Sequence, residues 1–188
     1  MKSLLIIPGF GENGKEKQYS IICKNAQKAG YKTHILVPEW GRTTLSQCTE
    51  EIRSKVTKMK VNTTETVLLG FSFGAFIGLE LCKKEHFNNF LCCSCSPYFK
   101  ENLIDIPKDA VLFFGKRRMS DFEKFSIKDL KDLKTKKIDF YFGDQDWNIG
   151  IMTMEKIATQ TNSKLKIIKD TGHELNVQYI EVIDKKIQ

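Results

Sequence analysis

The stretch Leu68–Ala75 reads Leu-Leu-Gly-Phe-Ser-Phe-Gly-Ala, and it decides the fold. It holds a Gly-x-Ser-x-Gly pentapeptide, with Ser72 between Gly70 and Gly74. The apolar residues before it predict a buried strand, and the pattern over Phe73–Lys84 predicts a helix. The two glycines leave room for a sharp turn, because a side chain there would strike the neighbouring elements. Such a turn would lift the Ser72 hydroxyl above the sheet, beside a helix N-terminus whose N–H groups favour negative charge.

A serine hydroxyl becomes a good nucleophile only when a base takes its proton, and the base needs an acid to orient it. Two later segments that read as strands are each followed by a polar loop. The first loop carries Asp144 and Asp146, and the second carries His173. Functional groups gather beyond the carboxyl ends of strands in open α/β sheets. The sequence therefore predicts Ser72, Asp146 and His173 as catalytic residues, with Asp144 as the alternative acid.

The other two histidines are less suited to be the base. His34 lies within a predicted strand, which favours a structural role, and His86 follows the predicted helix after Ser72, which favours a solvated position.

With these residues the chain resembles the α/β-hydrolase superfamily, over nearly its whole length. In that superfamily a nucleophile elbow, a Gly-x-x-Asp loop and a Gly-His loop follow one another in this order. The resemblance implies that Ser72 is the nucleophile, Asp146 the acid and His173 the base, and that no cofactor is needed.

The resemblance also implies an oxyanion hole made of two backbone N–H groups, those of Phe10 and Phe73. Phe10 lies in the loop after the first predicted strand, where Pro8 replaces a histidine that is common in the family. We expect the fixed φ of Pro8 to stiffen this loop. The aromatic side chains of Phe10, Tyr98 and Trp147 are expected to bind substrate, with ordinary core packing as the alternative.

A narrower resemblance involves Cys95–Phe99 and the segments 112–114 and 119–122. They are similar to parts of the esterases that demethylate the pimeloyl methyl ester on acyl carrier protein in biotin biosynthesis. This implies a carrier-bound methyl ester as one substrate. The basic cluster Lys116, Arg117 and Arg118 would then contact the acidic carrier protein, whereas the alternative is a solvated helix face.

The composition indicates one globular domain over residues 1–188, with 41% hydrophobic and 28% charged residues. The apolar run near the N-terminus is too short for a signal peptide, and no run is long enough for a membrane-spanning helix. Together with six cysteines that read as buried thiols, this predicts a cytoplasmic protein without disulfides. The cysteine and histidine spacing predicts no metal site.

The net charge of +7 raises the possibility of nucleic-acid binding. However, 26 of the 30 basic residues are lysine, and no nucleic-acid-binding module is recognisable. We therefore expect no nucleic-acid partner.

Strand and helix patterns alternate along the chain, which predicts a three-layer α/β/α fold with a mostly parallel sheet of about six strands. Relative to the full family sheet, two antiparallel edge strands would be missing. The segment 100–136, called here the cap segment, is expected to form a small cap. Within it, Ile106–Gly115 fits either a helix or an extra strand, and 120–133 has an amphipathic pattern.

The predicted function is that of a serine carboxylesterase acting on short to medium acyl esters. Two alternatives remain at this point. The same triad would serve an acyl thioesterase or a peptidase, and a non-catalytic interaction module could keep the fold.

Overall fold

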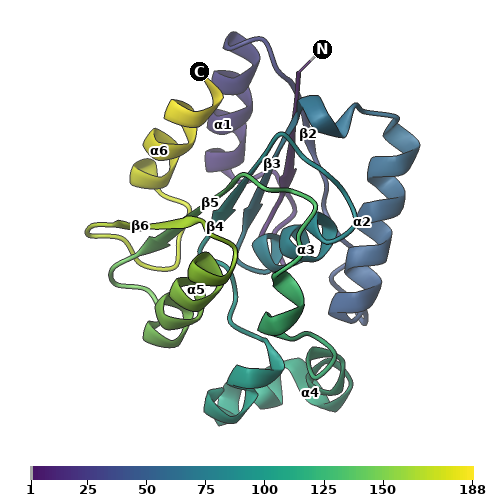
Figure 1. Cartoon of the computed structure of the whole chain (residues 1–188), viewed down its shortest axis with the longest axis vertical. Coiled ribbons are helices and arrows are strands. Elements are labelled where there is room, and N and C mark those ends of the chain that lie inside the picture. The colour runs from purple at the N-terminus through teal and green to yellow at the C-terminus, as the bar shows by residue number, and fades with distance from the viewer. Residues whose placement is uncertain (1) are drawn as a thin grey trace.

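A computed structural model describes residues 2–188. It contains one six-stranded sheet in the order β2-β1-β3-β4-β5-β6, with every neighbouring pair parallel (Figure 1). The prediction of a mostly parallel sheet of six strands is thus confirmed, and the sheet is parallel throughout. The strands are β1 (Ser3–Ile7), β2 (Lys32–Ile35), β3 (Thr66–Phe71), β4 (Asn89–Cys93), β5 (Ile138–Gly143) and β6 (Lys164–Ile168).

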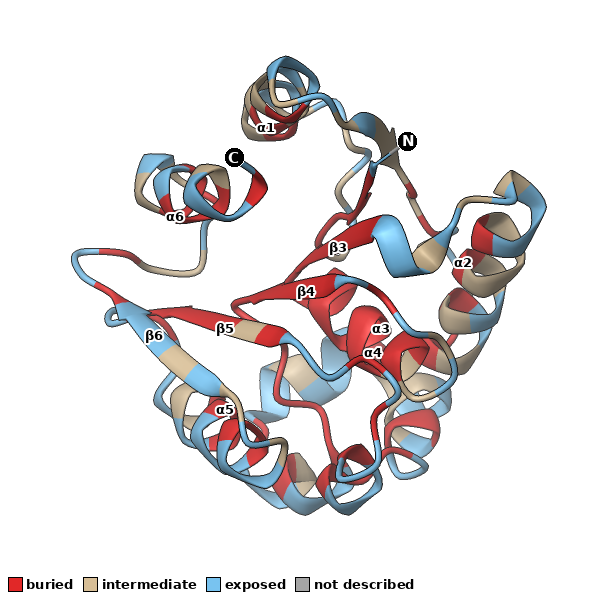
Figure 2. Cartoon of the chain, turned by 45° about the horizontal axis from the view of Figure 1, so that its top comes forward, coloured by how far each residue is buried: buried red, intermediate tan, exposed pale blue. Residues whose placement is uncertain are grey.

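Helices cover both faces of the sheet, as Figure 2 shows. One face carries α1 and α6, and the other carries α2, α3, α4 and α5. Because successive side chains of a strand point to opposite faces, Leu4 and Ile6 join the first of these cores, and Leu5 and Ile7 join the second. The helices are α1 (Lys17–Lys28), α2 (Leu45–Met59), α3 (Phe73–Cys82), α4 (Lys108–Phe122), α5 (Asn148–Gln160) and α6 (Val177–Ile187).

Local sequence explains where several helices begin. Thr44 precedes α2 and forms a capping box with Gln47. Helix α3 is buried on nearly all sides, which its apolar sequence allows.

The cap segment contains α4 and two short 3₁₀ helices, Lys100–Asp105 and Ile127–Leu130. Of the two structures predicted for 106–115, a helix or an extra strand, the structure shows the helix. Helix α4 is kinked at Gly115, which has φ 72°. The apolar residues of the amphipathic pattern in 120–133 are not on one helix, but all four are buried in the core. These residues are Phe122, Phe125, Leu130 and Leu133. In Figure 1 helix α4 lies at the end of the molecule opposite the two chain termini.

Candidate functional site

The sharp turn that holds Ser72 lies between β3 and α3. Ser72 has φ 54° and ψ −118°, a conformation that an L-residue adopts only where its surroundings enforce it. A Cβ added to Gly70 would lie 2.5 Å from the Cα of Ala75, and one added to Gly74 would lie 2.1 Å from the carbonyl oxygen of Ile7. Both glycines are therefore required by backbone packing, as the sequence predicted.

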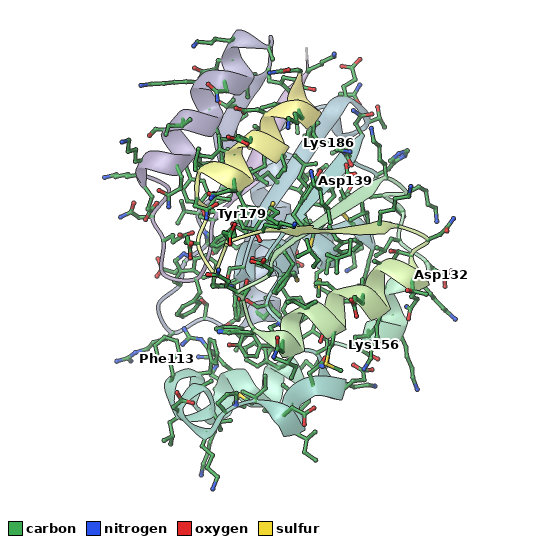
Figure 3. The ribbon with its side chains drawn as sticks, turned by 90° about the vertical axis from the view of Figure 1, so that its left-hand side faces the viewer. Phe113, Asp132, Asp139, Lys156, Tyr179 and Lys186 are labelled. Carbon is green, nitrogen blue, oxygen red and sulfur yellow. The ribbon has the colours of Figure 1, made fainter. Side chains whose placement is uncertain are left out.

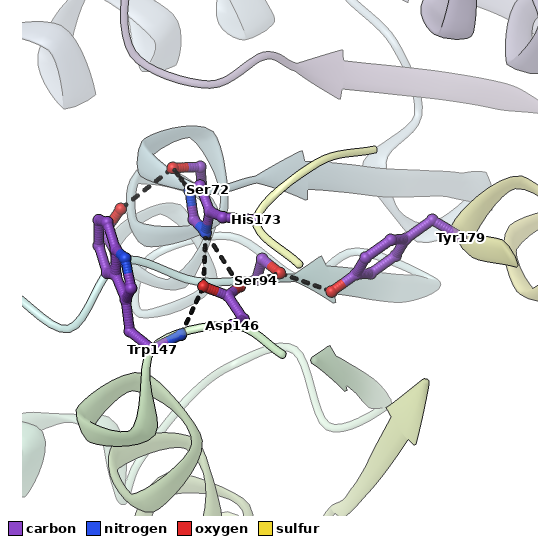
Figure 4. A network of polar contacts seen from close by, with 7 residues as sticks. Ser72, Ser94, Asp146, Trp147, His173 and Tyr179 are labelled. Carbon is purple, nitrogen blue, oxygen red and sulfur yellow. Dashed lines mark hydrogen bonds and ion pairs between the residues drawn. The ribbon is translucent and has the colours of Figure 1, made fainter. Parts of the chain in front are cut away.

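Ser72, His173 and Asp146 form a continuous hydrogen-bonded chain (Figure 4). The distance from Ser72 Oγ to His173 Nε2 is 2.8 Å. His173 Nδ1 lies 2.9 Å and 3.0 Å from the two carboxylate oxygens of Asp146. The structure thus places Ser72 and Asp146, two of the three residues that the sequence singled out, within hydrogen-bond distance of the third, His173, which is 101 positions from Ser72.

Gly143 explains how the loops of Asp146 and His173 meet. It ends β5, and a Cβ at this position would lie 2.1 Å from the carbonyl oxygen of Thr171. The backbones of the two loops therefore touch. The alternative acid, Asp144, accepts a hydrogen bond from the N–H of Thr171 and so lies in the same contact between the two loops, away from the imidazole hydrogen bonds that Asp146 makes.

The carboxylate of Asp146 accepts two further hydrogen bonds. The N–H of Trp147 donates to Oδ1 at 2.7 Å, and the hydroxyl of Ser94 donates to Oδ2 at 2.8 Å. Ser94 also lies 2.5 Å from the hydroxyl of Tyr179. Burial raises the pKa of Tyr179 well above its ordinary value, so its hydroxyl keeps its proton. The phenol can then donate to Ser94 while Ser94 donates to Asp146, and the acid is held from three directions.

The loop after β4 contacts the site through alternate residues. Ser94 donates a hydrogen bond to Asp146, Ser96 Oγ lies 3.3 Å from Ser72 Oγ, and Tyr98 lines the cavity beside Ser72. Sequence analysis missed Ser94 and Ser96, although both follow a strand of the sheet at its carboxyl edge, the signal that identified Asp146 and His173. Tyr179 had no signal in the sequence.

The loop after β1 is held by a half-buried carboxylate as well as by Pro8. Glu12 accepts hydrogen bonds from the N–H of Gly9 and from the hydroxyl of Tyr19. Burial, together with the negative charge of Glu12, raises the pKa of Tyr19, so this phenol remains a donor. The predicted role of Pro8 as the source of stiffness was therefore incomplete, because Glu12 ties the loop to α1.

A cavity of about 490 Å³ opens beside Ser72, within the size range of small-molecule sites. The predicted substrate-binding residues Phe10, Tyr98 and Trp147 all line it, as does Phe73. The Trp147 indole stacks on the imidazole of His173, with ring centroids 4.8 Å apart and planes 6° apart.

The basic cluster of α4 divides into two kinds of residue. Lys116 is exposed. Arg117 donates to the carbonyl of Arg42, and Arg118 donates to carbonyls of Trp40 and Thr43, so both guanidinium groups fasten α4 to the loop before α2. Contact with a carrier protein stays a prediction for this cluster.

Within residues 2–188, no group of three or more His, Cys, Asp or Glu side chains is arranged to hold a metal ion. Over the same part of the chain, no helix has both the length and the apolar character needed to cross a membrane.

Neither a scan against protein-family models nor a search of curated proteins gave a match. Solved structures do match. Est1E from Butyrivibrio proteoclasticus has a TM-score of 0.80 at 17% identity, over 99% of this chain and 85% of its own. Mouse alpha/beta hydrolase domain-containing protein 10 has a TM-score of 0.79 at 10% identity, over 98% of this chain and 87% of its own.

Arabidopsis thaliana SOBER1 has a TM-score of 0.67 at 11% identity, over 99% of this chain and 97% of its own. Esterases and hydrolases thus recur among proteins of similar structure. At these identities the likeness shows the fold, and the chain has the α/β-hydrolase fold over its described length.

Proposed function

We propose that this protein is a serine carboxylesterase. The observation that carries the proposal is the chain of hydrogen bonds from Ser72 through His173 to Asp146, with Ser72 on a strained elbow. A hydroxyl, an imidazole and a carboxylate in this geometry form an activated nucleophile. The esterases among the proteins of the same fold support the same conclusion.

In this mechanism His173 Nε2 accepts the proton of Ser72 as the oxygen attacks the ester carbonyl. Asp146 accepts a hydrogen bond from the Nδ1–H of His173, which fixes the tautomer and stabilises the imidazolium that forms. His173 then gives its proton to the leaving alcohol, and a water molecule hydrolyses the acyl-enzyme with the same base.

The developing oxyanion would be held by the N–H groups of Phe73 and Phe10. Phe73 is the first residue of α3, where helix geometry leaves the N–H without an intrahelical acceptor. The backbone N–H groups of the preceding residues already have acceptors and so are not available to the oxyanion. Ser72 N–H donates to the carbonyl of Cys93, and Gly9 N–H donates to Glu12. Removal of one such donor typically costs about 3–4 kcal/mol of transition-state stabilisation.

The substrate class is short to medium acyl esters, because the cavity is mainly apolar and its size suits a small molecule. A structure of Est1E has ferulic acid bound, which supports a carboxylic acid or its ester as the ligand of this fold. A carrier-bound methyl ester stays a narrower hypothesis, which depends on Lys116 and its neighbours contacting the carrier protein.

The test is covalent labelling with a fluorophosphonate probe, followed by peptide mapping and by ester hydrolysis assays. We expect the label on Ser72 and a fall in kcat of about 10³-fold or more in Ser72→Ala. Ser96→Ala is the matched variant, because its hydroxyl lies 3.3 Å from that of Ser72. Labelling in Ser96→Ala should stay on Ser72. Wild-type turnover by Ser72→Ala, or a label on Ser96, would contradict the mechanism.

A further inference from the structure

Six aromatic side chains line the cavity beside the proposed nucleophile. They come from four separate parts of the chain: the loop after β1, the start of α3, the loop after β4 with α4, and the start of α5. The six are Phe10, Phe73, Tyr98, Phe113, Phe114 and Trp147. An apolar cavity needs no aromatic rings, since leucine or valine would exclude water equally well. Aromatic rings from four parts of the chain therefore indicate a ligand whose contacts depend on ring faces and edges.

The inner rings are fixed by one another. Phe73, Tyr98 and Phe114 are all buried. The Phe73 and Phe114 rings stack with centroids 5.6 Å apart, and Tyr98 meets Phe114 edge-on at 4.8 Å. Aromatic pairs prefer such offset and edge-to-face contacts because the ring face is negative and the ring edge positive. The floor of the cavity thus presents ring faces and edges in set directions.

The outer rings are open to solvent. Phe113 is 66% exposed and Trp147 is 46% exposed. Phe113 meets Phe114 edge-on at 5.1 Å and Phe10 edge-on at 5.8 Å, so it extends the same arrangement toward the solvent (labelled in Figure 3). Large exposed aromatic side chains at the mouth of a cavity are typical of a binding surface. A ligand between Phe113 and the inner rings would complete their contacts.

The rings around this cavity carry no charge of their own. Burial, with the nearby charge of Asp109, raises the pKa of Tyr98 to about 12, so the phenol is neutral at physiological pH. The guanidinium of Arg118 already lies 5.0 Å from the centroid of the Phe10 ring. The Phe10 ring is therefore already paired with a cation, and this disfavours a second cation as the natural ligand of the cavity.

We propose that the cavity selects esters whose acyl part carries an aromatic ring. This inference rests on the proposed function and names the substrate class of the same site. A planar ring would meet the ring faces and edges of the walls with the geometry that aromatic pairs prefer, whereas a saturated ring gains only from burial. The ring is assigned to the acyl part because the leaving alcohol must lie near His173 Nε2, and of the six cavity rings it is Trp147 that stacks on that imidazole.

The test compares methyl 3-phenylpropanoate with methyl 3-cyclohexylpropanoate. The two esters have the same alcohol and the same saturated spacer, so their carbonyl groups are equally reactive. The cyclohexyl ester is the more hydrophobic, and burial alone therefore favours it. We expect kcat/KM to be about three- to tenfold higher for the phenyl ester, the size of effect that one or two aromatic contacts supply.

Phe113 is the ring to change, because its exposure lets it be replaced without loss of the core. Phe113→Leu should bring the ratio of the two kcat/KM values close to one, and Phe113→Tyr should keep it. Leu112→Ala is the matched control, since Leu112 is adjacent and 82% exposed but does not line the cavity. It should leave the ratio unchanged.

A ratio of one or less in the wild type would overturn the inference, and so would an unchanged ratio in Phe113→Leu. A second pair, benzyl butanoate and cyclohexylmethyl butanoate, places the ring in the alcohol. A preference for benzyl in this pair, without one in the first, would overturn the acyl assignment. Hydrolysis of methyl butanoate that depends on Ser72 shows the proposed function independently of either result.

If none of these esters is hydrolysed, the proposed function fails but the inference is still tested. Calorimetric titration of Ser72→Ala with 3-phenylpropanoate and with 3-cyclohexylpropanoate measures the same selectivity as binding. Tighter binding of 3-phenylpropanoate, reduced in Ser72→Ala/Phe113→Leu, would support the inference. Equal binding of the two acids would overturn it.

Discussion

The two sides of the candidate site are built by different means. The catalytic side, from the elbow at Ser72 to the loops of Asp146 and His173, is held by close backbone contacts at Gly70, Gly74 and Gly143. The cap segment is held to the body mainly by side chains, through aromatic rings and through the polar contacts of α4 with α2 and the loop before it. Backbone contacts at a glycine leave no room for a side chain, whereas side-chain contacts can be made by other residues of similar size and polarity.

The largest expected effect is the loss of stability when a glycine of the elbow is replaced, compared with the same replacement in the cap segment. Gly74→Ala would place a Cβ 2.1 Å from the carbonyl oxygen of Ile7, and backbone cannot yield as a side chain can. We expect a loss of about 4 kcal/mol or more, enough to unfold many domains of ordinary stability. Gly115→Ala has a positive φ but nothing within 4 Å of the new Cβ, so it should cost only about 1–2 kcal/mol.

Urea unfolding followed by circular dichroism measures both variants. Equal losses at the two positions would show that the elbow is no more constrained than the kink of α4, and the contrast between the two sides would fail.

The contrast also explains what the sequence could reveal. Backbone packing at the elbow requires glycine, and the required glycines form the Gly-x-Ser-x-Gly motif. From this motif the strand, the turn and the position of Ser72 could be predicted. Asp146 and His173 were predictable because parallel strands bring their carboxyl ends to one edge. Ser94 shares this position after a strand, but Tyr179 lies in α6, where a hydroxyl that supports an acid looks like any other buried polar residue. The kink at Gly115 was equally hidden, because glycine also fits a plain turn.

The second prediction concerns Ser94, which we expect to act through Asp146. Ser94→Ala removes a 2.8 Å hydrogen bond to a buried carboxylate. Hydrogen bonds to charged groups contribute about 1.5–3 kcal/mol, so we expect kcat/KM for ester hydrolysis to fall at least about tenfold. Tyr179→Phe keeps the Ser94 hydroxyl and should cost less.

A double-mutant cycle with Asp146→Asn decides whether Ser94 is a positioning residue. If Ser94 acts only by holding the acid, Ser94→Ala should have little further effect once Asp146 is an amide. Fully additive losses would mean that Ser94 supports the fold of its loop rather than the acid.

The smallest effect tests how the cap segment is attached. Asp121, near the end of α4, accepts hydrogen bonds from the N–H of Ser46 at 2.8 Å, from its hydroxyl at 2.7 Å and from Lys124 at 2.9 Å. Burial by itself would raise the pKa of Asp121, but these hydrogen bonds outweigh it and hold the pKa below its ordinary value of 3.8. A carboxylate with a lowered pKa stabilises the folded state above the unfolded-state pKa, and this contribution is lost as the pH falls through the folded-state pKa.

We therefore expect Asp121→Asn to lose about 1–2 kcal/mol of stability at pH 7. The difference from the wild type should be constant well above pH 3.8 and should shrink as the pH falls below 3.8, because the folded wild-type carboxyl takes up its proton only below its ordinary pKa. Lys124→Met is the matched control: Lys124 is 66% exposed, so its loss should cost well under about 1 kcal/mol. Urea unfolding at a series of pH values gives the comparison. A difference between Asp121→Asn and the wild type that is constant with pH would mean that the ionised carboxylate does not fasten α4 to α2, and the attachment would then depend on the aromatic contacts and arginines alone.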